Sequence, residues 1–159
     1  MDIVNDLVSR LERQACQGVP GPPKLAVAIV TCMDARIDPA RMFALRPGDA
    51  HVLRNAGGVV TDDVLRSLLL SQRFLGTRAV MVIHHTRCGA LNLSDDKVKA
   101  ELQAELGIRP SFALEGFTDL DADVRQSIAR IRQCPFLPHR DDVRGFVLDV
   151  DDGQLREVV

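Results

Sequence analysis

The 159-residue sequence contains no tryptophan and no tyrosine, so its aromatic content is limited to six phenylalanines. Proteins that bind single-stranded nucleic acid stack bases on aromatic side chains, and this scarcity argues against such a partner. The net charge is −2 and no basic patch is present, so the electrostatic footprint of a nucleic-acid-binding protein is also missing. We therefore expect no nucleic-acid partner.

Long apolar runs and a dense set of cysteines are missing too. No apolar run reaches the length of a membrane span, and the N-terminal MDIVNDLVSRLERQ has the pattern of an amphipathic helix rather than of a signal peptide. The four cysteines, at positions 16, 32, 88 and 134, are too few and too unevenly spaced for a disulfide-stapled secreted domain. We expect a cytoplasmic protein without a membrane partner, whose cysteines are reduced thiols or metal ligands.

The amino-acid composition suits one globular domain over residues 1–159, because 46% of the residues are hydrophobic and 26% are charged. The GVPGPP segment at 18–23 is typical of a linker after the N-terminal helix. Downstream, apolar runs alternate with helical patterns, which predicts an α/β fold with a mostly parallel central sheet flanked by helices.

Buried strands are predicted at 25–32, 50–56 and 79–85. The C-terminal pattern predicts two further strands, at 143–150 and 154–159, joined by a DDG turn. We expect the first strand to lie between the second and the third, with the fourth beyond the third. The sheet order would then be 2-1-3-4, with an antiparallel C-terminal edge strand. Capping residues and apolar periodicity predict further helices that begin at Asp38, Thr61, Ser94 and Thr118 and end near Leu45, Leu75, Gly107 and Pro135.

Residues able to bind a metal follow two of the expected strands. Cys32 ends the first strand, and HHTRCG at 84–89 places His85 and Cys88 at the end of the third. Ligands of open parallel sheets bind beyond the carboxyl ends of strands, where the strand order reverses, so these side chains converge if the two strands are neighbours. Two thiolates and one imidazole are a ligand set of catalytic zinc, with a fourth position for water or substrate. The sequence therefore predicts one zinc ion per chain.

Charged residues lie beside this predicted site, in TCMDAR at 31–36. Asp34 could accept a hydrogen bond from zinc-bound water while Arg36 holds its carboxylate bidentately. Alternatively, Asp34 could itself be the fourth ligand. His84 points to the opposite side of its strand from His85, so we expect it near the pocket rather than on the metal.

Three motifs carry a resemblance to a known family: C-x-D-x-R after the first strand, RNAGG after the second and H-x-x-C-G after the third. In this order they resemble the β-class carbonic anhydrases, in particular their compact prokaryotic branch, over about residues 24–89. The resemblance implies a β-carbonic anhydrase-like fold in which Cys32, His85 and Cys88 bind zinc. It also implies that Asp34 and Arg36 form a catalytic dyad.

The implied reaction is the attack of zinc-bound hydroxide on CO2 to give bicarbonate. The family builds its active sites at a dimer interface, which implies a homodimer or a dimer of dimers. Residues 1–23 would then pack on the partner subunit.

One position departs from the compact branch, in which many members carry aspartate where this chain has Arg87. This difference bears on the substrate, because a carbonyl sulfide hydrolase is similar to these carbonic anhydrases and uses the same zinc site. That enzyme converts carbonyl sulfide to CO2 and hydrogen sulfide. The residues expected to line the substrate pocket are Gly57, Gly58, His84, Arg87 and Gly89.

Two readings outside this enzyme class remain. A zinc-stabilised scaffold without catalysis is disfavoured by Asp34 and Arg36, because a structural site needs four protein ligands and no dyad. A thiol redox protein is disfavoured because the chain lacks the C-x-x-C spacing of that class.

Overall fold

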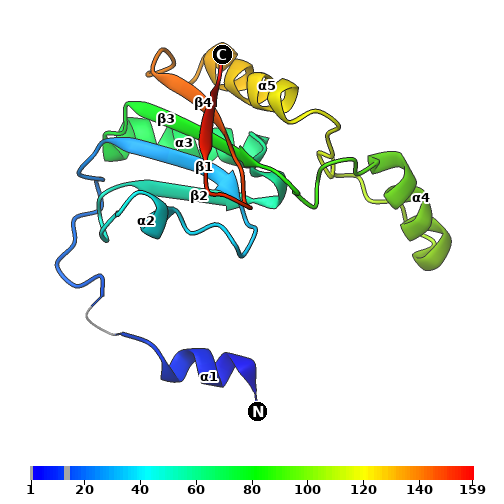
Figure 1. Ribbon diagram of the computed structural model, residues 1–159, viewed down its shortest axis with the longest axis horizontal. Coiled ribbons are helices and arrows are strands. Elements are labelled where there is room, and N and C mark those ends of the chain that lie inside the picture. The colour runs from blue at the N-terminus through cyan, green and yellow to red at the C-terminus, as the bar shows by residue number, and fades with distance from the viewer. Residues whose placement is uncertain (1, 13–14) are drawn as a thin grey trace.

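A computed structural model describes residues 2–12 and 15–159, which form a five-stranded sheet with helices around it (Figure 1). The strands are β1 (Val27–Cys32), β2 (His51–Asn55), β3 (Ala79–His85), β4 (Val143–Leu148) and β5 (Leu155–Val158). Their order is β2-β1-β3-β4-β5, with β5 antiparallel to β4 and all other pairs parallel. The predicted order and the antiparallel C-terminal edge strand are confirmed.

Helices cover the two faces of the sheet unequally. The helices are α1 (Ile3–Ser9), α2 (Pro39–Met42), the 3-10 turn η1 (Ala56–Gly58), α3 (Asp62–Leu75), α4 (Asp95–Leu106) and α5 (Leu120–Gln133). The apolar sides of α3 and α5 pack against one face of the sheet, whereas α2 is the helix beside the other face (Figure 1). Both α1 and α4 project away from the sheet in the same view. No helix in the part of the chain described is long and apolar enough to cross a membrane.

Most helix ends lie where the sequence predicts them. Asp38, Thr61 and Ser94 each accept a hydrogen bond from a backbone N–H in the first turn of the helix that follows. Gly76 and Gly107 adopt the left-handed conformation that closes α3 and α4. These ends depend on contacts within a few residues, so local sequence is enough to place them.

Several predicted boundaries are wrong, including the end of α2, which lies at Met42 rather than near Leu45. The cap of α5 is Asp119 rather than Thr118, because the Asp119 carboxylate lies where it accepts from the backbone N–H of Ala122. The first strand begins two residues later than expected, since Ala26 has a positive φ of 51° that interrupts the extended chain. The N-terminal helix is shorter than predicted, ending at residue 9; positions 1, 13 and 14 of the expected helix lie outside the described residues.

The two faces of β3 lead to different parts of the molecule. Val80 and Val82 join the core between the sheet and the α3–α5 layer, and His84, on the same side, bonds to α5. Ile83 belongs to a second buried cluster on the opposite side, which includes Cys32 and Cys88. Cys32 and Cys88, two of the candidate metal ligands, therefore lie on the face of the sheet opposite α3 and α5.

Candidate metal centre

Cys32, His85 and Cys88 converge where β1 and β3 end side by side. One ligand atom from each residue lies within 4.8 Å of the other two, and the Sγ atoms of Cys32 and Cys88 are 3.9 Å apart. A tetrahedral zinc ion with Zn–S bonds of about 2.3 Å separates two sulfurs by about 3.8 Å. The spacing of the thiols therefore fits this metal without movement of the backbone.

The imidazole of His85 is oriented as a ligand. Its Nδ1 lies 2.8 Å from the carbonyl oxygen of Thr86, which accepts a hydrogen bond from the protonated Nδ1 and leaves the lone pair on Nε2. The ring is fully buried, and Nε2 has no hydrogen-bond partner within residues 2–12 and 15–159. An unpaired buried nitrogen is costly unless something binds it, and a metal ion satisfies that need.

Burial tunes both kinds of ligand. It lowers the pKa of His85, which favours the neutral imidazole that binds metals. It also raises the pKa of the Cys88 thiol, so a bound cation must displace a proton to obtain the thiolate.

Asp34 and Arg36 form an ion pair at the edge of this cluster. Arg36 Nε donates to Asp34 Oδ1 at 2.9 Å and Nη2 donates to Oδ2 at 2.7 Å, so the fork is bidentate. Asp34 Oδ2 also lies 3.9 Å from His85 Nε2, the unpaired nitrogen of the candidate ligand cluster. The hydrogen bonds from the side chain and backbone of Arg36 hold the pKa of Asp34 well below its usual range, so the carboxylate is ionised at neutral pH.

Comparison with known proteins agrees with this geometry. Residues 27–155 match the family model described as carbonic anhydrase, a span that contains all three ligands and both members of the ion pair.

The chain belongs to the β-carbonic anhydrase family. It is 53% identical over 140 residues to β-carbonic anhydrase 1 of Mycobacterium bovis, covering 88% of this chain and 86% of that one. A carbonic anhydrase structure from Streptococcus mutans superimposes with a TM-score of 0.88 at 39% identity, over 99% of this chain and 95% of the other. Carbon disulfide hydrolase of Saccharolobus solfataricus is 31% identical over 182 residues, covering 98% and 89% of the two chains.

The RNAGG segment packs against the candidate metal centre. Arg54 Nε donates to the carbonyl of Cys32 at 3.0 Å, and its Nη2 donates to the carbonyl of Asp34 at 2.7 Å. Gly57 and Gly58 are buried with positive φ, and a Cβ on Gly58 would lie 2.9 Å from the backbone N of Cys32. The segment thus packs against the end of β1, which carries Cys32. Arg54 also holds the backbone of Cys32 and Asp34, a role that the RNAGG motif alone did not reveal.

The other residues expected in the substrate pocket lie around the cluster rather than in it. His84 Nε2 is 2.6 Å from Asp123 of α5, on the side of the sheet away from the ligands. The Arg87 side chain is largely exposed and pairs with Asp151 at 2.6 Å. A Cβ on Gly89 would meet no described atom within 4 Å, so the space beside it is open.

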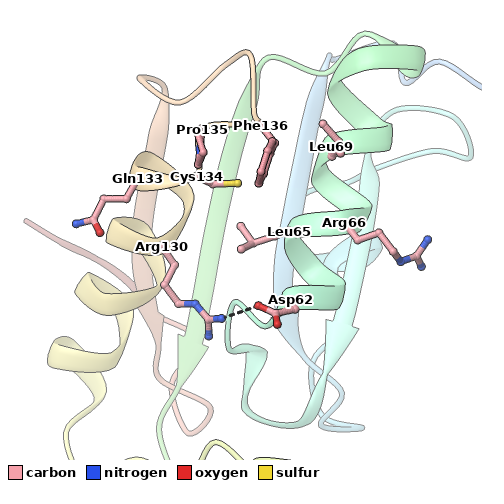
Figure 2. Close-up of a pocket in the computed structure, with 9 residues that line it drawn as sticks. All are labelled: Asp62, Leu65, Arg66, Leu69, Arg130, Gln133, Cys134, Pro135 and Phe136. Atoms are coloured by element: carbon pink, nitrogen blue, oxygen red, sulfur yellow. Dashed lines mark hydrogen bonds and ion pairs between the residues drawn. The ribbon is translucent and has the colours of Figure 1, made fainter.

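A separate groove lies between α3 and α5 (Figure 2). Its volume is about 530 Å³, and the Asp62–Arg130 ion pair, 3.1 Å long, crosses one end of it. The residues that line it are Asp62, Leu65, Arg66, Leu69, Arg130, Gln133, Cys134, Pro135 and Phe136. All of these belong to α3, α5 or the segment after α5, so the groove is distinct from the candidate metal centre.

Proposed function

We propose that the chain hydrates CO2 to bicarbonate with one zinc ion held by Cys32, His85 and Cys88. The observation that carries this proposal is the convergence of three ligand atoms within 4.8 Å of one another beside a carboxylate held by arginine. Similarity to β-carbonic anhydrase 1 over 88% of this chain supports it. The four cysteines are free thiols, which supports the cytoplasm as the compartment, because its reducing conditions keep thiols available to metals.

Zinc, when bound, would supply a Lewis acid that lowers the pKa of water and so provides a nucleophile near neutral pH. Three protein ligands leave a fourth position for that water, the arrangement of catalytic rather than structural sites. The thiols must lose their protons to bind, and the neutral imidazole needs no such loss.

Asp34 is the group that orients the attacking water and accepts its hydrogen bond. Its Oδ2 stands 3.9 Å from His85 Nε2, while its own ionised state is maintained by Arg36. Because both carboxylate oxygens are engaged by the guanidinium, this fork opposes movement of Asp34 onto the metal. We therefore propose that the resting site keeps its fourth position for water.

Hydrolysis of carbonyl sulfide or carbon disulfide is the second candidate. The 31% identity to carbon disulfide hydrolase over 98% of this chain supports it. Each of these substrates is a linear molecule whose central carbon would be attacked by the same water-derived nucleophile as CO2. Its sulfur would then leave as hydrogen sulfide.

One set of measurements separates these substrates. We expect about one zinc per chain by elemental analysis, and rapid-mixing assays in which CO2 hydration is far faster than the release of hydrogen sulfide from carbonyl sulfide or carbon disulfide. Faster release of hydrogen sulfide would assign the second function. Tightly bound zinc with none of the three activities would indicate a non-catalytic scaffold.

We also propose that the working unit is at least a homodimer with residues 1–23 on the partner. All seven residues of α1 are exposed or half-exposed, and the apolar ones among residues 2–12 form the set Ile3, Val4, Leu7, Val8 and Leu11. At one edge of the sheet, β2 presents the exposed side chain of Val52 and an unshared row of backbone groups. Both features are expected of surfaces that a second subunit covers.

A further inference from the structure

The turn between β4 and β5, residues 149–154, contacts the loop that carries the metal ligand Cys88. Thr86 begins that loop and lies against the turn. Its backbone N–H donates to the carbonyl of Leu148 at 2.9 Å, and its Oγ1 accepts from the backbone N–H of Val150 at 3.1 Å. The Thr86 hydroxyl also donates to Asp149 Oδ1 at 3.4 Å. A single threonine is thus fixed to the end of β4 through its main chain and to the turn through its side chain.

The next residue, Arg87, has a backbone conformation that needs support. Its φ is 55°, in the left-handed region that a bulky residue rarely adopts without constraint. Its guanidinium donates to Asp151 of the same turn at 2.6 Å. With both side chains largely exposed, the pair adds little to global stability, but it ties the strained residue to the turn.

The strained conformation directs a carbonyl group toward the catalytic ion pair. The carbonyl oxygen of Arg87 accepts a hydrogen bond from Arg36 Nη2 at 3.1 Å. The same Nη2 donates to Asp34 Oδ2 at 2.7 Å. A change in the backbone at position 87 would therefore remove one of the two acceptors that hold this nitrogen of Arg36.

We propose that the β4–β5 turn is a positioning element of the metal centre: Thr86 and Arg87, anchored by Asp149 and Asp151, aim the Arg87 carbonyl at Arg36 and so orient Asp34. The chemistry at the metal does not involve the turn directly. This assigns the arginine at position 87 a role within the chain, with its charge neutralised by Asp151 rather than offered to substrate. The kinetic consequences rest on the proposed function, whereas the placement of Arg36 does not.

Two variants remove the anchors separately. Thr86→Val keeps the shape of the side chain but loses both hydroxyl contacts, and Asp151→Asn weakens the exposed ion pair without touching the core. Thr86→Ser restores the hydroxyl. The matched control is Glu157→Gln, because Glu157 forms an equally short pair with Arg144, at 2.6 Å, on the same hairpin but without a contact to the loop that carries Cys88.

In zinc-loaded enzyme we expect Thr86→Val and Asp151→Asn each to lower kcat about tenfold, the scale of a small misplacement of catalytic groups, with KM and zinc content nearly unchanged. Thr86→Ser should recover most of the kcat, and Glu157→Gln should match the wild type. Equal losses in Glu157→Gln, or unchanged kcat in both test variants, would overturn the proposal.

Crystal structures of the two variants supply a readout that does not depend on activity. We expect Arg36 Nη2 to leave the Arg87 carbonyl and the fork on Asp34 to open. If wild-type enzyme shows no activity on CO2, carbonyl sulfide or carbon disulfide, the proposed function fails while this structural test still decides the inference. Unmoved Arg36 side chains in both variants would refute it.

Discussion

Cys32 is the residue whose replacement most directly tests the metal centre. It is the candidate ligand supplied by β1, whereas His85 ends β3 and Cys88 lies in the loop that follows it. We expect Cys32→Ser to lose most of its zinc and most of its activity, because two ligands do not hold zinc and serine oxygen replaces thiolate poorly. Elemental analysis of protein with an unchanged circular dichroism spectrum provides the measurement.

Cys16→Ser is the matched control, since Cys16 is exposed and is not part of the ligand cluster. Full zinc occupancy in Cys32→Ser would show that the ligands are assigned wrongly. So would a structure in which His84 rather than His85 contacts the metal.

The proposed role of Asp34 is in the rate of the reaction rather than in metal binding. We expect Asp34→Asn to retain zinc, because three ligands remain, while turnover falls about 100-fold, as for loss of a positioned proton-handling group. Arg36→Ala should also slow the enzyme and free Asp34 to approach the metal. Rapid-mixing kinetics beside metal analysis test both, and an unchanged rate in Asp34→Asn would remove the ion pair from the mechanism.

The low pKa of Asp34 also predicts how stability depends on pH. A carboxyl group whose pKa is lower in the folded state stabilises the fold above its ordinary pKa and loses that contribution as the pH falls through the lowered value. The stability advantage of wild-type enzyme over Asp34→Asn should therefore be constant near neutral pH and shrink below about pH 4. Urea unfolding at several pH values measures it, and an advantage that changes between pH 6 and 8 would contradict the prediction.

At the scale of elements, the η1 turn must approach the end of β1 closely. Gly58 has a φ of 71°, and an added Cβ would lie 2.9 Å from the backbone of both Thr31 and Cys32. We expect Gly58→Ala to cost more than backbone strain alone, about 2 kcal/mol or more, because backbone atoms cannot move aside as a side chain can. Zinc affinity should fall as well, since the displaced segment carries Cys32.

Gly107→Ala is the control variant, because it measures the cost of the backbone strain alone. Gly107 has a similar φ of 72°, but its added Cβ would meet no described atom within 4 Å. Denaturant unfolding of the two variants should show a clearly larger loss for Gly58→Ala. Equal losses would mean that the close approach to β1 is relieved without cost.

At the scale of the whole molecule, α1 provides a test of the proposed dimer. Its apolar side chains Leu7 and Val8 are 58% and 65% exposed, which is unfavourable unless another surface covers them. We expect the Leu7→Ser, Val8→Ser double variant to shift sedimentation toward monomer and to lose activity, while Ser9→Ala on the same helix behaves as wild type. A wild-type monomer with full activity at micromolar concentration would contradict the proposal.

The sequence by itself predicted the strands and the three residues of the candidate ligand cluster, and its resemblance to the β-carbonic anhydrases implied the strand order. Apolar runs mark buried strands, caps mark helix ends, and Cys32, His85 and Cys88 follow strands whose carboxyl ends meet at a reversal of strand order. The bidentate fork of Arg36 on Asp34 was also predictable, because the two residues lie two positions apart in one short motif. Such features depend on residue type and on spacing of a few positions.

Only the tertiary structure decided which distant side chains support the site. Asp123 lies 39 positions after His84, and Asp151 lies 64 positions after Arg87, and neither pair shares a motif. The hydrogen bond from Arg36 to the Arg87 carbonyl depends on a left-handed backbone that arginine does not favour on its own. These contacts arise where separate elements meet, so they depend on the register and packing of the whole sheet, which no local pattern specifies.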